Sequence, residues 1–299
     1  MATEHLSVLK AETLAFLGPR PGGVYCDATL GRGGHAEAIL DASAPDGRLY
    51  AIDRDAQAIE ESRDRLSRFG ARVRFLHGRF GDALSLLDAA GAPRLDGVVA
   101  DLGVSSPQLE EAERGFSFRH DGPLDMRMDR SRGRTARELI ADLSERELAD
   151  VLYTYGEERR SRPIARSIKQ AEERGELLTT GDLRRAVVRV LGPARGGIDP
   201  GTRTFQALRI AVNEELGELD ALLAALPELL ADGGVAVILS FHSLEDRAVK
   251  LAFRASEVLT SLTKKPVVAG DDEARVNPRA RSAKLRAARR EPRAREASA

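Results

Sequence analysis

The chain has 299 residues, of which 42% are hydrophobic and 31% charged, and its formal net charge is −1. This composition excludes a disordered chain and allows one large α/β domain with an insertion, or two modest domains. The single cysteine, Cys26, excludes a disulfide framework, and no apolar run reaches the roughly 20 residues that span a bilayer. The N-terminus lacks the pattern of a signal peptide. We therefore expect a soluble, cytoplasmic protein.

The first hundred residues alternate strand and helix signals. Short runs rich in β-branched and apolar residues predict strands, whereas residues 56–69 have the spacing of a helix. Glycines at 31–34 predict a tight turn after the first strand. Strands that alternate with helices indicate parallel βαβ units and a doubly wound α/β sheet. The predicted strands are 24–28, 48–53, 72–77 and 97–101.

The strand signal disappears between about 107 and 201, where 136–155 and 164–190 have helical spacing. Alternation then resumes. Apolar residues three or four apart from Phe205 to Leu230 predict one long helix that ends at Gly233 and Gly234. A fully apolar strand follows over 235–240, and another helix begins at Ser243. The middle of the chain therefore reads as a helical insertion in an α/β domain.

The strongest local pattern follows the first predicted strand. Asp27 ends that strand, the glycines of residues 31–34 form the turn, and a helix begins directly afterwards. Glycines let backbone N–H groups approach a ligand closely. A second carboxylate, Asp53, ends the next strand, 22 residues after Gly31, at the position where a ribose diol is bound. The pattern predicts a cofactor that contains a nucleoside.

Two cofactors fit this turn, because residues 31–36 also match the G-x-G-x-x-G/A dinucleotide fingerprint. A pyrophosphate beside Asp27 would meet a like charge in a partly desolvated cleft. S-adenosylmethionine carries a sulfonium and an ammonium instead, and both favour a nearby carboxylate. We therefore favour S-adenosylmethionine over NAD. A glycine turn without any ligand would leave both carboxylates unexplained.

A third carboxylate, Asp101, ends the predicted strand 97–101. In open α/β sheets, ligands bind outside the carboxyl ends of the strands. Asp101 is therefore predicted to lie beside the methyl donor. Ser105, Ser106 and Gln108 in the following loop either are ordinary turn residues or form hydrogen bonds with the cofactor or a base.

Ten segments along the chain carry a specific resemblance. On these segments the chain resembles the bacterial 16S ribosomal RNA (cytosine-N4)-methyltransferase family, RsmH or MraW. Family members usually have His and Ala where this chain has Asp199 and Gly201. The segments are HLSVL at 5–9, the turn at 27–36, DRD at 53–55, DLGVSSPQL at 101–109, RGFSF at 114–118, DGPLDMRMD at 121–129, YGEER at 155–159, TRTFQALRIAVNEEL at 202–216, SFHSLEDR at 240–247 and NPRARSAKLR at 277–286.

The resemblance implies a Rossmann-like class I methyltransferase with a mostly parallel sheet and a helical insertion domain. It implies S-adenosylmethionine as methyl donor, and a cytidine N4 amine of 16S ribosomal RNA in the small ribosomal subunit as acceptor. Residues 1–107 and 202–299 are then the cofactor-binding domain, and residues 108–201 are an insertion that recognises RNA. Asp101 is the candidate catalytic residue. The implied cofactor contacts are Gly33, Gly34, His35, Asp53, Phe80, Asp101 and Gln108.

Two basic segments are candidate RNA contacts. Between Arg114 and Arg137, seven arginines are mixed with Phe116 and Phe118, which suits phosphates and splayed bases, or else a surface ion-pair network. From Arg275 to Arg295, nine Lys or Arg accompany one acid. That run indicates either an arm that contacts phosphates or a solvated tail.

His242 lies just after the strand 235–240 and is predicted either to face the same cleft or to be a structural histidine. The histidines and the single cysteine form no metal-ligand pattern, so we expect no metal. Two other functions remain open. One is a methyltransferase that acts on another RNA, a protein or a small molecule, and the other is a non-catalytic ribosome-assembly factor. Three carboxylates at three strand ends argue against the second.

Overall fold

The computed structural model describes residues 7–194, 197 and 199–292. The chain divides into two compact units. The first comprises Met1–Gly103 and Leu216–Ala299, and the second comprises Val104–Glu215. The second unit is longer at both ends than the insertion predicted over 108–201. The main reason is that helix α10 (Thr202–Asn213) packs against helix α7 (Glu145–Gly156). Both helices therefore belong to the second unit.

The first unit is built on a seven-stranded sheet with the order β3-β2-β1-β4-β5-β7-β6. Strands β1 to β5 are parallel, and β7 is antiparallel to both of its neighbours. This mixed, mostly parallel arrangement confirms the predicted Rossmann-like fold class. The strands are β1 (Val24–Asp27), β2 (Arg48–Asp53), β3 (Val73–His77), β4 (Leu95–Asp101), β5 (Leu230–Ser240), β6 (Leu259–Ser261) and β7 (Lys284–Arg290).

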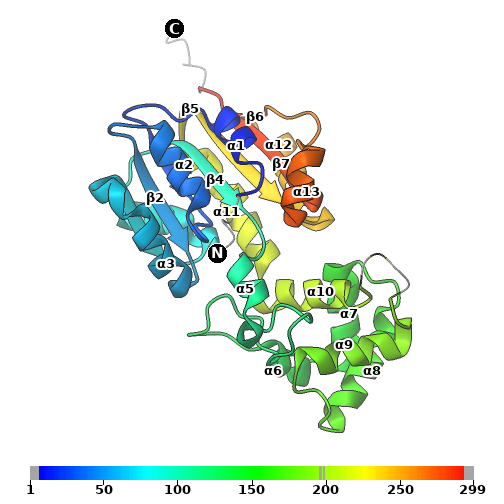
Figure 1. Ribbon diagram of the computed structural model, residues 1–299. Coiled ribbons are helices and arrows are strands. Elements are labelled where there is room, and N and C mark those ends of the chain that lie inside the picture. Colours follow the sequence, from blue (N-terminus) through cyan, green and yellow to red (C-terminus); the bar gives the residue numbers. More distant parts are fainter. Residues whose placement is uncertain (1–6, 195–196, 198, 293–299) are drawn as a thin grey trace. The chain divides into compact units, whose positions relative to one another are not determined.

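Helices cover both faces of this sheet, because successive strand residues point to opposite sides. Tyr25 joins the core beneath one set of helices, whereas Cys26 joins the core beneath the other. The first set is α1 (Lys10–Leu17), α2 (Gly34–Ala42) and α3 (Ala56–Leu66). The second set is α4 (Ala83–Ala89), α11 (Glu215–Leu229) and α12 (Ser243–Ala255), and Figure 1 shows the two layers around the strands.

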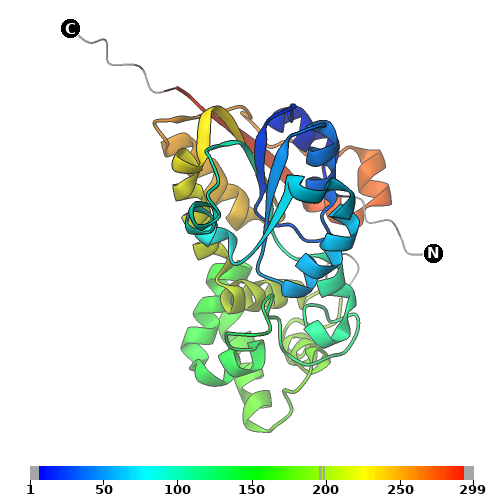
Figure 2. The ribbon, with the colours of Figure 1, turned by 90° about the vertical axis from the view of Figure 1, so that its left-hand side faces the viewer.

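The second unit is helical in its described residues, apart from an isolated bridge between Pro123 and Thr179. Figures 1 and 2 show it in colours from turquoise (α5) through green to yellow-green (α10). Its apolar core is separate from the two cores that flank the sheet. The helices are α5 (Ser106–Glu110), α6 (Ala136–Asp142), α7 (Glu145–Gly156), α8 (Ser161–Glu173), α9 (Thr180–Leu191) and α10 (Thr202–Asn213).

Three helices predicted as continuous are each broken in two. The first, predicted over 136–155, breaks because Ser144 starts a new helix by accepting the N–H of Glu147. The second, predicted over 164–190, breaks at Thr179, whose side chain likewise caps α9. The third, predicted from Phe205 to Leu230, breaks because Glu214 adopts a left-handed conformation with φ of 55°. Helix α11 then ends at Leu229, before Gly233 and Gly234.

Strand β7 lies inside the segment predicted as a basic arm or tail. Within it, Arg286 and Arg290 are buried while Arg289 is exposed. Arg286 donates to Asp246, and Arg290 donates to the carbonyl of Pro227 and forms an ion pair with Asp232. Residues 284–290 are therefore part of the sheet. Arg293 and Arg295 lie outside the described residues.

No helix among the described residues has both the length and the apolar character required to cross a membrane.

Candidate active site

Three carboxylates lie at the carboxyl ends of three neighbouring strands. Asp53 ends β2, Asp27 ends β1 and Asp101 ends β4, and these strands are adjacent in the order β2-β1-β4. The chain reverses its direction of travel across the sheet between β1 and β4, which is where open α/β sheets bind ligands. The charges of Asp101 and Asp53 both act on Asp27, so the three groups form one electrostatic cluster.

Asp27 is the most deeply buried member of the cluster. Its Oδ1 accepts the N–H of Thr29 at 3.1 Å. Its buried Oδ2 has no hydrogen bond of normal geometry among the described residues, although the backbone N–H of Ala36 also favours the ionised carboxylate. Burial raises the pKa of Asp27 to about 7, and the neighbouring charges of Asp101 and Asp53 add to that rise. Asp27 is therefore close to half-ionised near neutral pH.

The glycine turn after β1 is held by hydrogen bonds to the backbone of β2 and to a side chain of α3. Gly31 and Gly33 have φ of 49° and 74°, which favours glycine at both positions. The N–H of Leu30 donates to Ile52, and the carbonyl of Gly31 accepts from Ser62. Gly34 is the first residue of α2. The turn therefore leads directly from the end of β1 into a helix N-terminus.

Asp53 also fixes this turn, a role that sequence reasoning did not identify. Its Oδ2 accepts the N–H of Gly31 and its Oδ1 accepts the N–H of Asp55, both at 2.8 Å. Burial raises the pKa of Asp53 to about 6, against the effect of these hydrogen bonds. Each carboxylate oxygen can accept a second hydrogen bond. The position therefore remains compatible with the predicted contact to a ribose diol.

His35 lies on the first turn of α2 and is only 6% exposed. Its Nε2 is 3.7 Å from Oδ2 of Asp101, too far for a normal hydrogen bond. Burial, with the charge of Lys10, lowers the pKa of His35 to about 4, so the ring is neutral at pH 7. Burial also raises the pKa of Asp101 to about 6. The contact is therefore a neutral imidazole beside a carboxylate.

The remaining predicted contacts fall in different places. Phe80 begins a 3-10 turn, η2 (Phe80–Asp82), after β3, and its ring packs partly buried against the core beneath α4 and α11. Gln108 belongs to the second unit, where it is buried and its Oε1 accepts the N–H of Ser105 at 3.0 Å. All the other predicted contacts are in the first unit.

His242 has a local structural role. It is the N-cap of α12, where its Nδ1 accepts the N–H of Glu245 at 3.4 Å. Its Nε2 lies 3.1 Å from Oε1 of the same Glu245, and the two side chains are 9% and 3% exposed. This arrangement supports the structural interpretation of His242. Among the described residues, no group of three or more His, Cys, Asp or Glu is placed to hold a metal ion.

Comparison with known proteins decides the family. The model of the MraW methylase family matches residues 2–291. The chain belongs to this family. A relative from Sorangium cellulosum, named ribosomal RNA small subunit methyltransferase H, is 62% identical over 96% of this chain and 91% of its own length. A relative of the same name from Synechocystis is 51% identical over 94% of this chain and 92% of its own length.

This MraW family member is a methyltransferase whose methyl donor is S-adenosylmethionine. Its buried polar atoms suit that donor. Oδ2 of Asp27, Nε2 of His35 and Oδ1 of Asp101 are buried without a hydrogen-bond partner among the described residues. Leaving such groups unpaired is costly, and a bound ligand would supply them with partners. Two of the three are carboxylate oxygens, which match a ligand that carries a sulfonium and an ammonium.

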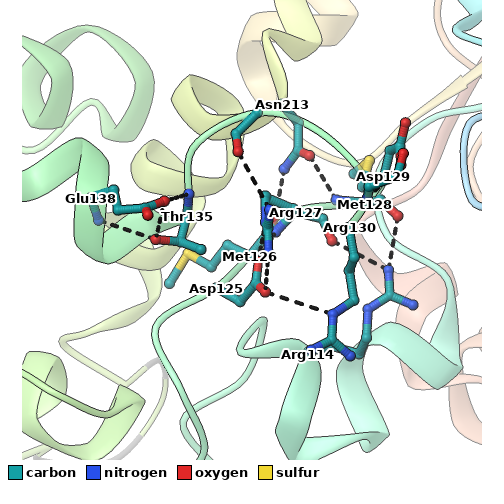
Figure 3. Close-up of polar contacts among 12 residues, drawn as sticks. Arg114, Asp125, Met126, Arg127, Met128, Asp129, Arg130, Thr135, Glu138 and Asn213 are labelled. Carbon is teal, nitrogen blue, oxygen red and sulfur yellow. Dashed lines mark hydrogen bonds and ion pairs between the residues drawn. The ribbon is translucent and has the colours of Figure 1, made fainter.

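The basic segment of the second unit contains both structural and exposed arginines. Arg114 is buried, and its guanidinium donates to the carbonyls of Arg127 and Met128. The amide of Asn213 donates to the carbonyl of Met126 at 2.7 Å and accepts the N–H of Met128 at 2.9 Å. Figure 3 shows Arg114 and Asn213 holding the segment from different sides. Arg114 therefore shapes this loop.

The exposed arginines of this segment fall into two groups. Arg132 pairs with Asp129, and Arg134 pairs with Asp142. Arg119 and Arg137 are exposed and form no ion pair with any other described residue. The segment thus contains part of the ion-pair network that the sequence allowed, together with cations available to a ligand.

Proposed function

We propose that this chain transfers a methyl group from S-adenosylmethionine to the N4 amine of a cytidine in the 16S ribosomal RNA of the small ribosomal subunit. The relatives named above support the substrate class. The observation that carries the chemistry is the buried, unpartnered Oδ1 of Asp101 at the end of β4, beside the end of β1.

We further propose that the cofactor is held by residues of the glycine turn and its surroundings. The backbone of Gly33 and Gly34 approaches the ligand, His35 packs beside it, and Asp53 accepts from the ribose hydroxyls. Phe80 contacts the adenine ring, and Gln108 is a further proposed contact. Asp27 stabilises the positive charge of the donor. Because its pKa is raised to about 7, a cationic ligand can increase the ionised fraction of this carboxylate.

S-adenosylmethionine supplies an activated methyl group on a sulfonium. Cytosine N4 is a weak nucleophile because its lone pair is delocalised into the ring. Holding the reacting atoms in line contributes ~7–11 kcal/mol in favourable cases. Methylation also leaves N4 with one proton to lose, and we propose that Asp101 accepts the hydrogen bond from N4 and takes that proton. Its pKa of about 6 makes Asp101 a stronger base than an ordinary aspartate, while leaving it mostly ionised at pH 7.

The second unit is proposed to recognise the RNA. The proposed phosphate contacts are Arg119 and Arg137, which are exposed and form no ion pair within the described chain. Arg114, which the sequence grouped with them, is assigned instead to the support of the loop at 126–128.

The test is a methyl-transfer assay on isolated small subunits, followed by mass spectrometry of the digested ribosomal RNA. N4-methylcytidine is the expected product. Free 16S RNA, transfer RNA and bulk protein serve as competing substrates. Methylation of only a competitor would contradict the proposed substrate, and absence of any transfer by a protein that binds S-adenosylmethionine would favour an assembly factor.

The same assay tests Asp101. We expect Asp101→Asn to lower kcat by about 10²–10⁴-fold, as removal of a positioned acid–base group does. Asp88→Asn is the matched control, because Asp88 is exposed on α4 of the same unit. Normal turnover by Asp101→Asn would contradict the catalytic role of Asp101 and leave it only a structural role at the end of β4.

A further inference from the structure

The turn that contains Phe80 is held by a residue far away in the chain. Glu218, in the first turns of α11, reaches the residues on both sides of Phe80. Its Oε1 accepts from Nη1 of Arg79 at 2.9 Å, and its Oε2 accepts the N–H of Gly81 at 3.0 Å. One carboxylate therefore holds the side chain of the residue before the aromatic ring and the backbone of the residue after it.

The turn also lies unusually close to the helix. A Cβ atom at Gly81 would lie 2.8 Å from Oε2, 3.1 Å from Cα and 3.2 Å from the carbonyl oxygen of Glu218. Two of these atoms belong to the backbone of α11 and cannot move aside easily. A larger residue than glycine would therefore push the whole turn away from the helix.

The carboxylate of Glu218 is buried and therefore depends on these two donors. Its side chain is 6% exposed, and a buried carboxylate is unfavourable unless it is paired and hydrogen-bonded. Leu219 and Leu222, on the same helix, are buried in the core against which Phe80 packs. The packing of Leu219 and Leu222 therefore fixes the position of α11. Glu218 ties the turn to this helix.

We propose that Glu218 is a positioning residue for cofactor binding: by holding Arg79 and Gly81 it sets the place of the Phe80 ring against the adenine of S-adenosylmethionine. This inference rests on the proposed contact of Phe80 with adenine. Aromatic contacts depend on ring offset and separation, so a small shift of the turn weakens them. Glu218 itself touches neither the cofactor nor the reacting group.

The experiment measures the affinity of Glu218→Gln for S-adenosylhomocysteine and S-adenosylmethionine by calorimetry. The substituted amide leaves one of the two donors, Arg79 or Gly81, facing an NH₂ group. We expect affinity to fall about threefold to tenfold, with KM for the donor rising and kcat at saturation unchanged. Glu228→Gln is the control, because Glu228 is exposed on the same helix, and its affinity should equal that of the original protein.

A double-mutant cycle separates positioning from general damage. In a Phe80→Ala background, Glu218→Gln should weaken binding no further, because the ring through which it acts is gone. An equal loss in both backgrounds would overturn the inference. Gly81→Ala disturbs the same contact from the turn side and should weaken binding in the same way, which keeps the test available if Glu218→Gln folds poorly.

The two assumptions fail differently. If Phe80→Ala binds S-adenosylhomocysteine with unchanged affinity, the adenine contact is wrong and the inference falls with it. If Phe80→Ala weakens binding while Glu218→Gln and Gly81→Ala do not, only the positioning role is overturned. Melting temperatures of all variants, measured without ligand, show whether a lost affinity reflects lost folding.

Discussion

At the scale of single residues, burial sets the charge of the site. It raises the pKa of Asp27 to about 7 and those of Asp53 and Asp101 to about 6, against about 3.9 for a free aspartate. A carboxyl group whose pKa is higher in the folded than in the unfolded chain contributes stability that is present below pH ~4. That contribution is lost as pH rises through 6 to 7. The ligand-free protein is therefore less stable at neutral pH than it would be with these carboxyl groups protonated.

A cationic ligand should stabilise the ionised carboxylates, so its affinity should depend on pH. Ionised carboxylates favour the sulfonium and the ammonium, and these groups ionise as pH rises through 6 to 7. We therefore expect the affinity for S-adenosylmethionine to increase from pH 5 to pH 8, by up to about a hundredfold if binding restores an ordinary pKa to Asp27. Calorimetry in two buffers of different ionisation enthalpy also measures the protons released.

The control for this prediction is Asp27→Asn, which cannot ionise. Its affinity should vary less with pH than that of the original protein. S-adenosylhomocysteine lacks the sulfonium charge and should likewise give a shallower profile. A flat profile for S-adenosylmethionine with the original protein would mean that the three carboxylates do not sense the ligand charge.

At the scale of single elements, β7 changes the interpretation of the basic C-terminal segment. The strand pairs with β5 and β6 and contains two buried arginines. Cutting the chain after Ala288 would remove the last two residues of the strand together with any RNA contact. Such a truncation therefore cannot test whether this segment binds RNA.

Two neighbouring arginines of β7 offer a cleaner test. Arg290 is buried and donates to the carbonyl of Pro227 at 2.9 Å, whereas Arg289 is exposed. We expect Arg290→Ala to lower the free energy of unfolding by about 1–3 kcal/mol, because it removes a buried side chain together with its hydrogen bond to Pro227. Arg289→Ala should change it by less than about 0.5 kcal/mol. Equal urea midpoints for the two variants would contradict a structural role for Arg290.

At the scale of the whole molecule, we expect the first unit to bind the cofactor and the second unit to bind the RNA. The first unit contains the carboxylate cluster, the glycine turn and Phe80, whereas the second contains the arginine-rich segment. Changes to exposed arginines of the second unit should therefore alter RNA binding and leave cofactor binding unchanged.

The double variant Arg119→Ala/Arg137→Ala tests this division. If each residue contacts one phosphate, the slope of log affinity against log salt should fall by about 1.4–1.8. Arg166→Ala is the matched control, because Arg166 is also exposed in the second unit but pairs with Glu145. Binding to small subunits is measured at several salt concentrations, with the affinity for S-adenosylhomocysteine measured alongside. An unchanged slope would place the phosphate contacts elsewhere.

The sequence by itself determined the fold class, the strands β1 to β4 and the carboxylates at their ends. These depend on short-range properties, namely apolar runs, glycine positions and the order of residues along the chain. The same local signals predicted the glycine turn between β1 and α2. Apolar periodicity also predicted helices in the middle of the chain, but not where they break, since the stripe from Phe205 to Leu230 continues through the break at Glu214.

Only the tertiary structure decided the contacts between distant segments. The bond from Arg79 to Glu218 joins residues 139 positions apart, and that from Met128 to Asn213 joins residues 85 positions apart. Strand β7 likewise exists because β5 and β6 offer unpaired backbone groups on either side of it. Local composition makes residues 284–290 read as a solvated basic run, since an isolated arginine costs least in water. Burial with specific partners reverses that preference, and those partners are known only once the chain has folded.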